Sequence, residues 1–92
     1  MRVVINFKGP ISKRIDCSSI EIEAERGATL SEALIKIIKD EPYLQSIWRA
    51  PEEIDRDSMI LCNGIDVGVL GGLEMIMREG DVLTILPLVH GG

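Results

Sequence analysis

Apolar and polar residues alternate along residues 2–8. Val3, Ile5 and Phe7 share one face, whereas Val4 stands among the polar residues of the other face. A period of two is typical of a strand with one buried face. Residues 20–25 repeat the pattern with glutamate at every second position. They predict a second strand whose acidic outer row is solvated and discourages edge-to-edge association.

A longer period follows the break at Gly27. Thr29 and Glu32 have the spacing of a capping box, which predicts that a helix begins there. The next apolar residues recur at the spacing of one buried helical stripe. They are Leu30, Ala33, Leu34, Ile37 and Ile38. Because Pro42 disfavours helical backbone before it, this amphipathic helix should end there and lie across the sheet.

The pattern weakens in residues 43–57. Leu44 and Trp48, with Tyr43 and Ile47, are consistent with one further helical turn at the edge of the core. Residues 51–57 carry mostly charged side chains and predict an acidic loop.

The remaining residues predict short strands joined by tight turns. Residues 58–62 form an apolar run, Asn63-Gly64 is a strong turn signal, and residues 65–67 can pair back. After a turn at residues 79–81, residues 82–86 predict the last strand, with Leu83 and Ile85 inward if Thr84 faces out. This order of elements predicts an α+β fold of the β-grasp type, a mixed sheet with one main helix packed across it. The first and last strands would be parallel neighbours.

Size and charge limit the range of functions. The 92 residues suffice for one domain, and 46% of them are apolar. The net charge of −5 disfavours direct binding of nucleic acid and favours solubility or basic protein surfaces. Cys17 and Cys62 do not form a metal or redox motif, and Cys62 is expected to be a buried apolar residue. The N-terminus has no long apolar run, so we expect no membrane segment and a reducing, cytoplasmic location.

The chain ends on Gly91-Gly92. Two residues without Cβ atoms leave the terminal carboxylate on a stem that another protein's backbone can approach closely. Pro87 suits a strand that leaves its sheet, so we expect a domain over residues 1–86 and a flexible tail over residues 87–92. Six extended residues reach roughly 20 Å. The simpler interpretation is a frayed terminus, since terminal residues are usually mobile.

Several motifs together resemble one family. They are residues 27–30, Asn63-Gly64, residues 70–73, residues 79–81 and the terminal residues 86–92. In this order they resemble the MoaD and ThiS sulfur carriers, the ubiquitin-related modifiers and the archaeal small modifiers. The ending His90-Gly91-Gly92 and the long segment between helix and third strand favour the ubiquitin-related modifiers, whereas Asn63-Gly64 and Leu86-Pro87 favour MoaD.

The resemblance implies a protein that is acted upon and is not itself an enzyme. An E1-like enzyme would use ATP and Mg to adenylate the carboxylate of Gly92, which would then become a thiocarboxylate or be joined to a lysine amine. The chain itself would bind no cofactor and no metal, and its sequence contains no nucleophile with an adjacent base. Gly91, His90 and Leu88 would serve in recognition of the tail, since a lone histidine there has nothing to hold it as a base.

The partners implied by the resemblance are an E1-like adenylyltransferase and a sulfurtransferase. Others are the large subunit of molybdopterin synthase, a tRNA thiolation enzyme and lysines of target proteins. The sequence leaves open which of these applies. We predict that Val4 and Leu86, on the outer faces of neighbouring strands, form an apolar docking surface that leads to the tail. The alternative function is a non-covalent β-grasp interaction module whose Gly-Gly end is incidental.

Overall fold

The computed structural model describes residues 1–15 and 18–88. Its elements follow the predicted order, with further short helices between them. In chain order they are β1 (Arg2–Phe7), α1 (Ile11–Arg14), β2 (Ser19–Glu23), α2 (Leu30–Asp40), α3 (Pro42–Ile47), α4 (Pro51–Asp57), β3 (Ser58–Cys62), β4 (Ile65–Asp66), η1 (Val67–Leu70), η2 (Gly72–Glu74) and β5 (Val82–Pro87).

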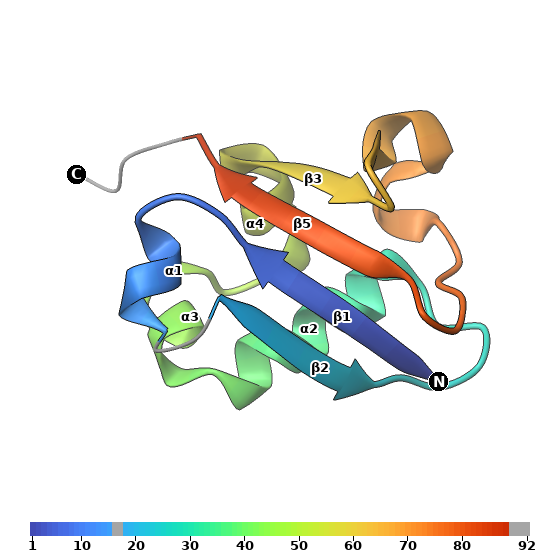
Figure 1. The fold of residues 1–92 in the computed structure, drawn as a ribbon, viewed down its shortest axis with the longest axis horizontal. Coiled ribbons are helices and arrows are strands. Elements are labelled where there is room, and N and C mark those ends of the chain that lie inside the picture. The colour runs from blue at the N-terminus through green and yellow to red at the C-terminus, as the bar shows by residue number, and fades with distance from the viewer. Residues whose placement is uncertain (16–17, 89–92) are drawn as a thin grey trace.

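The strands form one mixed sheet in the order β2-β1-β5-β3-β4. The first and last strands, β1 and β5, lie side by side and parallel at its centre, as predicted, and the other pairs are antiparallel. Helices α2, α3 and α4 lie behind the sheet in Figure 1, so they cover one face and leave the other open. The predicted α+β arrangement is confirmed.

Helix α2 begins and packs as its sequence predicts. The Thr29 hydroxyl accepts a hydrogen bond from the Glu32 N–H (3.2 Å), and the Glu32 carboxylate accepts one from the Thr29 N–H (3.0 Å). All five residues of the predicted stripe are buried. They meet the inward residues of β1 and β5 in a mainly aliphatic core.

The predicted acidic loop at residues 51–57 is wrong, because these residues form helix α4. Pro51 takes the first helical position, where no backbone donor is needed, and Glu52 and Glu53 lie in the first turn, where the helix dipole favours negative charge. Ile54 is fully buried. Ile54 is the one aliphatic residue among these seven residues, so the sequence shows no helical spacing of apolar positions that could have predicted α4. The predicted turn before it is helix α3, and Pro42 is at its start.

Strand β5 runs one residue further than predicted, to Pro87. Its last pair with β1 joins Ile85 to Phe7, whereas its pairing with β3 continues to Pro87. The Leu88 N–H then donates to the Asp57 carbonyl oxygen on the β3 side (2.8 Å). Successive N–H groups of a strand point to opposite sides, so an N–H at position 87 would point toward β1. Because β1 has already ended there, a proline, which has no N–H, costs no hydrogen bond at this position. The boundary between domain and tail at residues 86 and 87 stays a prediction.

Candidate functional site

The predicted reactive end of the chain lies partly outside the described residues. Gly92, Gly91 and His90 belong to residues 89–92, which are not described. Leu88 is the last described residue, and 60% of its surface is exposed. Of the predicted tail residues, the structure therefore describes only Pro87 and Leu88, at the end of the central strand β5.

The tail leaves the domain beside Asp57, at the end of α4. The Asp57 carbonyl oxygen holds the Leu88 N–H, and its carboxylate accepts hydrogen bonds from Trp48 Nε1 (3.1 Å) and from Arg56 Nε (2.7 Å). Both hydrogen bonds lower the pKa of the Asp57 carboxyl from its usual value, and the bond from Arg56 has the larger effect. A segment that the sequence predicted to be a loop thus tethers Leu88, the second residue of the predicted tail.

Thr84 sets the parity of β5 as predicted. Leu83 and Ile85 are fully buried, and Leu86 is half-buried on the open face of the sheet. Val4 is also half-buried on that face. Both predicted docking residues therefore face outward.

The strand register separates these two residues. Val4 pairs with Val82, whereas Leu86 pairs with Met59 of β3. From Val82 to Leu86 is four residues, roughly 13 Å at about 3.3 Å per residue. The predicted patch of Val4 with Leu86 is therefore corrected to a tail-side patch of Leu86, Met59 and Leu88.

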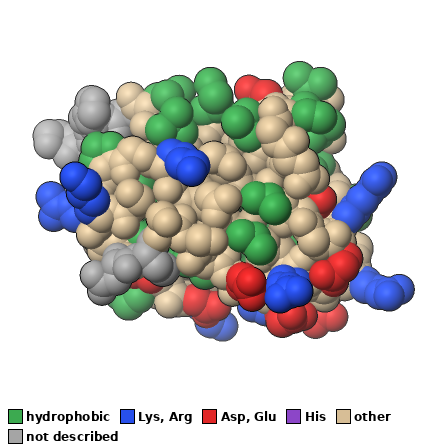
Figure 2. All heavy atoms as spheres, in the orientation of Figure 1, with side chains coloured by type: hydrophobic (Ala, Val, Ile, Leu, Met, Phe, Trp, Pro, Cys, Tyr) green, Lys and Arg blue, Asp and Glu red, His purple; other side chains and the backbone are tan. Residues whose placement is uncertain are grey.

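Met59, which sequence reasoning missed, is 41% exposed on the open face. The half-buried Leu61 of the same strand pairs with Thr84 and lies on this face too. Figure 2 shows hydrophobic side chains along its upper edge, over β3 and the end of β5, and a smaller group over the middle of the sheet. Residues 58–62 are nearly all apolar, so their sequence could not indicate which of them face outward.

The motif residues at the opposite end of β5 have a structural role. Asn63 has a positive φ of 51°, followed by Gly64 at 85°, as a tight hairpin turn requires. The Asn63 side chain donates to Asp81 (2.9 Å) and accepts from the Val82 N–H (2.9 Å). Asp81, which is buried, also accepts from the Arg78 N–H (2.8 Å). These bonds join the two predicted turns and hold the start of β5.

Cys62 is buried as predicted, with 3% of its surface exposed. Burial raises the pKa of its thiol to about 11, and the charge of Asp81 and a hydrogen bond to it act in the same direction. Cys62 is therefore a protonated core residue at neutral pH.

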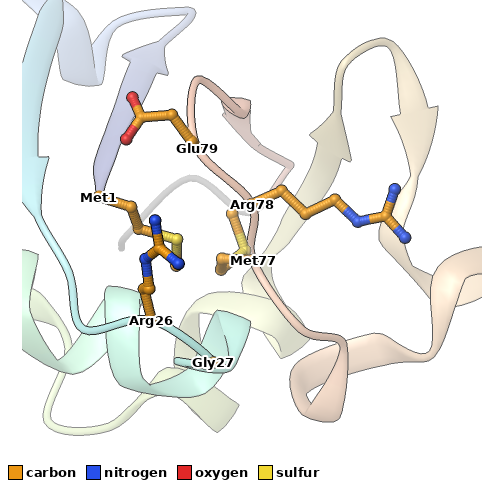
Figure 3. Close-up of a pocket in the computed structure, with 6 residues that line it drawn as sticks. All are labelled: Met1, Arg26, Gly27, Met77, Arg78 and Glu79. Carbon is orange, nitrogen blue, oxygen red and sulfur yellow. The ribbon is translucent and has the colours of Figure 1, made fainter.

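The pockets formed by the described residues include two that lie away from Leu88. A pocket of about 430 Å³ lies at the start of β1, with Met1 and Met77 close together, and the Arg78 side chain points away from them (Figure 3). A pocket of about 440 Å³ lies beside the turn after β3. Within residues 1–15 and 18–88, no cluster of three His, Cys, Asp or Glu side chains could hold a metal ion. None of the helices in these ranges has the length and apolar character that crossing a bilayer requires.

A second apolar surface includes residues that line the pocket beside β3, namely Ile65, Leu70 and Ile76, and the neighbouring Val69. Its exposed aliphatic residues, which we call the distal patch, are Ile65, Val69, Leu70 and Ile76. Val69 is the most exposed of them, at 79%. In Figure 1 the segment that contains η1 and η2 lies at the end of the sheet opposite the C-terminus. A substitution in the distal patch can therefore serve as a control for substitutions in the tail-side patch.

Solved structures with the same fold include several small carrier and modifier proteins. The small archaeal modifier protein 1 from Methanosarcina acetivorans has a TM-score of 0.76 and 21% identity, with 99% of this chain and 96% of that chain covered. A chain of the BexX/CysO complex from Amycolatopsis orientalis has a TM-score of 0.68 and 30% identity, with 98% and 99% covered. A chain of the complex of subunits 1 and 2 of molybdopterin-converting factor from Helicobacter pylori has a TM-score of 0.63 and 26% identity, with both chains covered completely.

The match to a family model extends the likeness through the end of the chain. None of the curated proteins matches the chain at a significant level. The model of the ThiS family matches residues 9–92, which include the last strand and both terminal glycines. With this match and the β-grasp fold of its structural neighbours, the chain belongs to the ThiS family.

Proposed function

We propose that this protein is a ubiquitin-like sulfur carrier or protein modifier that an E1-like enzyme activates at Gly92. The observation that carries the proposal is the family match over residues 9–92, which continues through Gly91 and Gly92. The geometry supports it, because the central strand β5 leads directly to the tail, and an apolar patch borders its end. The names of the relatives, a modifier protein and a subunit of molybdopterin-converting factor, point the same way.

The chemistry requires activation because a carboxylate is a poor electrophile. In the activating enzyme, an oxygen of the Gly92 carboxylate attacks the α-phosphorus of Mg-bound ATP, and pyrophosphate leaves. The resulting acyl-adenylate has AMP as its leaving group. A hydrosulfide equivalent that attacks its carbonyl carbon expels AMP and leaves a thiocarboxylate, whereas a lysine amine gives an isopeptide bond. The chain contributes the electrophile and its placement, and the partner enzymes contribute the ATP site.

The intact mass of the protein isolated from its native cells tests this function. Sulfur in place of one terminal oxygen is the expected result for a carrier that donates sulfur, whether to molybdopterin or to tRNA. For a modifier we expect branched peptides on lysines of other proteins. The last residue after which trypsin cleaves is Arg78, so the tryptic remnant would contain residues 79–92. Finding neither mark would instead support a non-covalent interaction module.

The tail-side patch gives a prediction about docking on the activating enzyme. Changing Leu86 to Asp should weaken binding to that enzyme by more than about tenfold, roughly 1.4 kcal/mol, because a charge replaces apolar surface beside the tail. Isothermal titration with the enzyme measures the change. Val69→Asp, in the distal patch, introduces the same charge and should leave the affinity within about twofold, roughly 0.4 kcal/mol.

Because Leu86 is half-buried, Met59→Asp provides a second test on a more exposed position. Circular dichroism and thermal unfolding establish that each variant is folded. If folded Leu86→Asp and Met59→Asp both bind with the wild-type affinity, the enzyme does not dock on this face.

A further inference from the structure

Basic residues gather where the tail leaves the domain. Lys8, Lys13 and Arg14 are exposed and fall within residues 8–14, which contain no acidic residue. The Lys8 N–H donates to the Ile85 carbonyl oxygen (3.0 Å), so this segment is attached to the end of β5. Figure 1 shows the loop between β1 and α1 near the end of β5, with α1 beyond it at the same end of the molecule, and Figure 2 shows Lys and Arg side chains at that end. We call these three residues the basic end.

The basic end also borders the tail-side patch. A Cβ atom added at Gly9 would lie 3.5 Å from Leu86 Cδ1, in ordinary van der Waals contact. Lys8 follows Asn6 by two residues and so continues the outward row of β1 past its end. The chain therefore passes directly beside Leu86 at Gly9, between Lys8 and the start of α1.

This concentration of positive charge contrasts with the rest of the chain. Outside residues 8–14 there are seven basic and fifteen acidic residues. Glu21 and Glu23 form an exposed outward row on β2, and Glu52 and Glu53 begin α4. A cluster of three basic residues at one end of an acidic molecule gives it a directional field, which orients it as it approaches a charged partner.

We propose that the basic end docks on an acidic protein surface that borders the tail-binding channel of the activating enzyme. This inference rests on the proposed function and specifies, in addition, that the enzyme surface that meets the basic end is negatively charged. Exposed charges of this kind act mainly on the association rate and little on the final affinity. A nucleic-acid partner fits less well, because a phosphate backbone would also meet the glutamates of β2.

Matched charge reversals test the proposal on the full-length protein. The double variant Lys8→Glu, Lys13→Glu changes the charge by four at the basic end, and Arg26→Glu, Arg78→Glu changes it equally at the other end of the molecule. Association with the E1-like enzyme of the same genome is followed by stopped-flow fluorescence, with ATP–pyrophosphate exchange measured in parallel. At low ionic strength the first variant should associate about tenfold or more slowly. At 1 M salt, where the Debye length is about 3 Å, this difference should shrink to less than about twofold.

The control variant should associate within about twofold of the wild-type rate at low ionic strength, within the variation expected of a distant charge. Equal slowing of both variants would overturn the proposal, because net charge would then be the cause. Unchanged association of the folded first variant would overturn it as well. If that variant does not fold, Lys8→Gln, Lys13→Gln replaces it and should show a smaller loss in the same direction.

The two proposals fail differently. If the wild-type protein supports no ATP–pyrophosphate exchange, the proposed function is wrong and this inference with it. If the wild type is adenylated and the basic-end variant associates normally, only the docking proposal fails. Loss of binding to a tRNA in a gel-shift assay, with association to the enzyme unchanged, would assign the basic end to nucleic acid and would also overturn it.

Discussion

Deleting Gly91 and Gly92 is expected to abolish acyl-adenylate formation and to leave the fold intact. The deletion removes the carboxylate at Gly92 and the stem without Cβ atoms that allows close approach. The described core consists of residues between Val3 and Ile85. The free energy of unfolding should therefore change by less than about 0.5 kcal/mol, as for most surface changes. ATP–pyrophosphate exchange with the E1-like enzyme and denaturation by urea measure the two effects.

Two further variants separate the possible causes of that loss. Gly91→Leu keeps the terminal carboxylate and should also prevent adenylation, because the added side chain excludes the stem from a narrow channel. Val69→Asp, which leaves the tail untouched, should be adenylated normally. Adenylate formed by the truncated protein would contradict the assignment of Gly92 as the activated residue.

Truncating the buried stripe of α2 should have the largest effect on stability. Leu34 and Ile37 are both fully buried between α2 and the sheet. Replacing either with Ala removes apolar contacts and leaves a cavity, so the free energy of unfolding should fall by about 2 to 5 kcal/mol. In a domain whose total stability is about 5 to 15 kcal/mol, this is a large fraction.

Ile35 provides the control within the same helix, because 51% of its surface is exposed. Ile35→Ala should change stability by less than about 1 kcal/mol, since little buried surface is lost and Ala favours the helix. Urea denaturation followed by circular dichroism measures all three variants. A loss below about 1 kcal/mol at both Leu34 and Ile37 would show that the stripe does not hold the sheet and helix together.

The features that local sequence predicted correctly are those whose cause is local. The buried stripe of α2 repeats over more than two helical turns. The helix is capped locally, because the side chains of Thr29 and Glu32 each accept a hydrogen bond from the other residue's backbone N–H. The turn at Asn63-Gly64 depends on two adjacent residues that accept a positive φ. Burial of Leu83 and Ile85 followed from the parity that Thr84 sets.

The features that were missed depend on contacts distant in the chain. Leu86 meets Met59 only through the register of β5 with β3, and no local pattern in either strand specifies that register. Helix α4 is stabilised by burial of Ile54 in a core made by other segments. The part of the site that needs long-range pairing, namely the tail-side patch and the tether at Asp57, therefore became visible only in the structure.

Under the proposed function, the hydrogen bond from the Leu88 N–H to the Asp57 carbonyl oxygen limits the distance between the domain and the Gly92 carboxylate. While that bond holds, Gly92 is four residues beyond Leu88, and four residues span at most about 14 Å. A longer tail would allow enzymes bound in one orientation to place their catalytic centres at different distances from the domain. With this short tail, each partner that uses Gly92 would have to bring its catalytic centre within that distance of the end of β5. If the proposed function holds, successive enzymes would have to bind the same end of the domain in turn, and the protein would have to leave one before the next could process it.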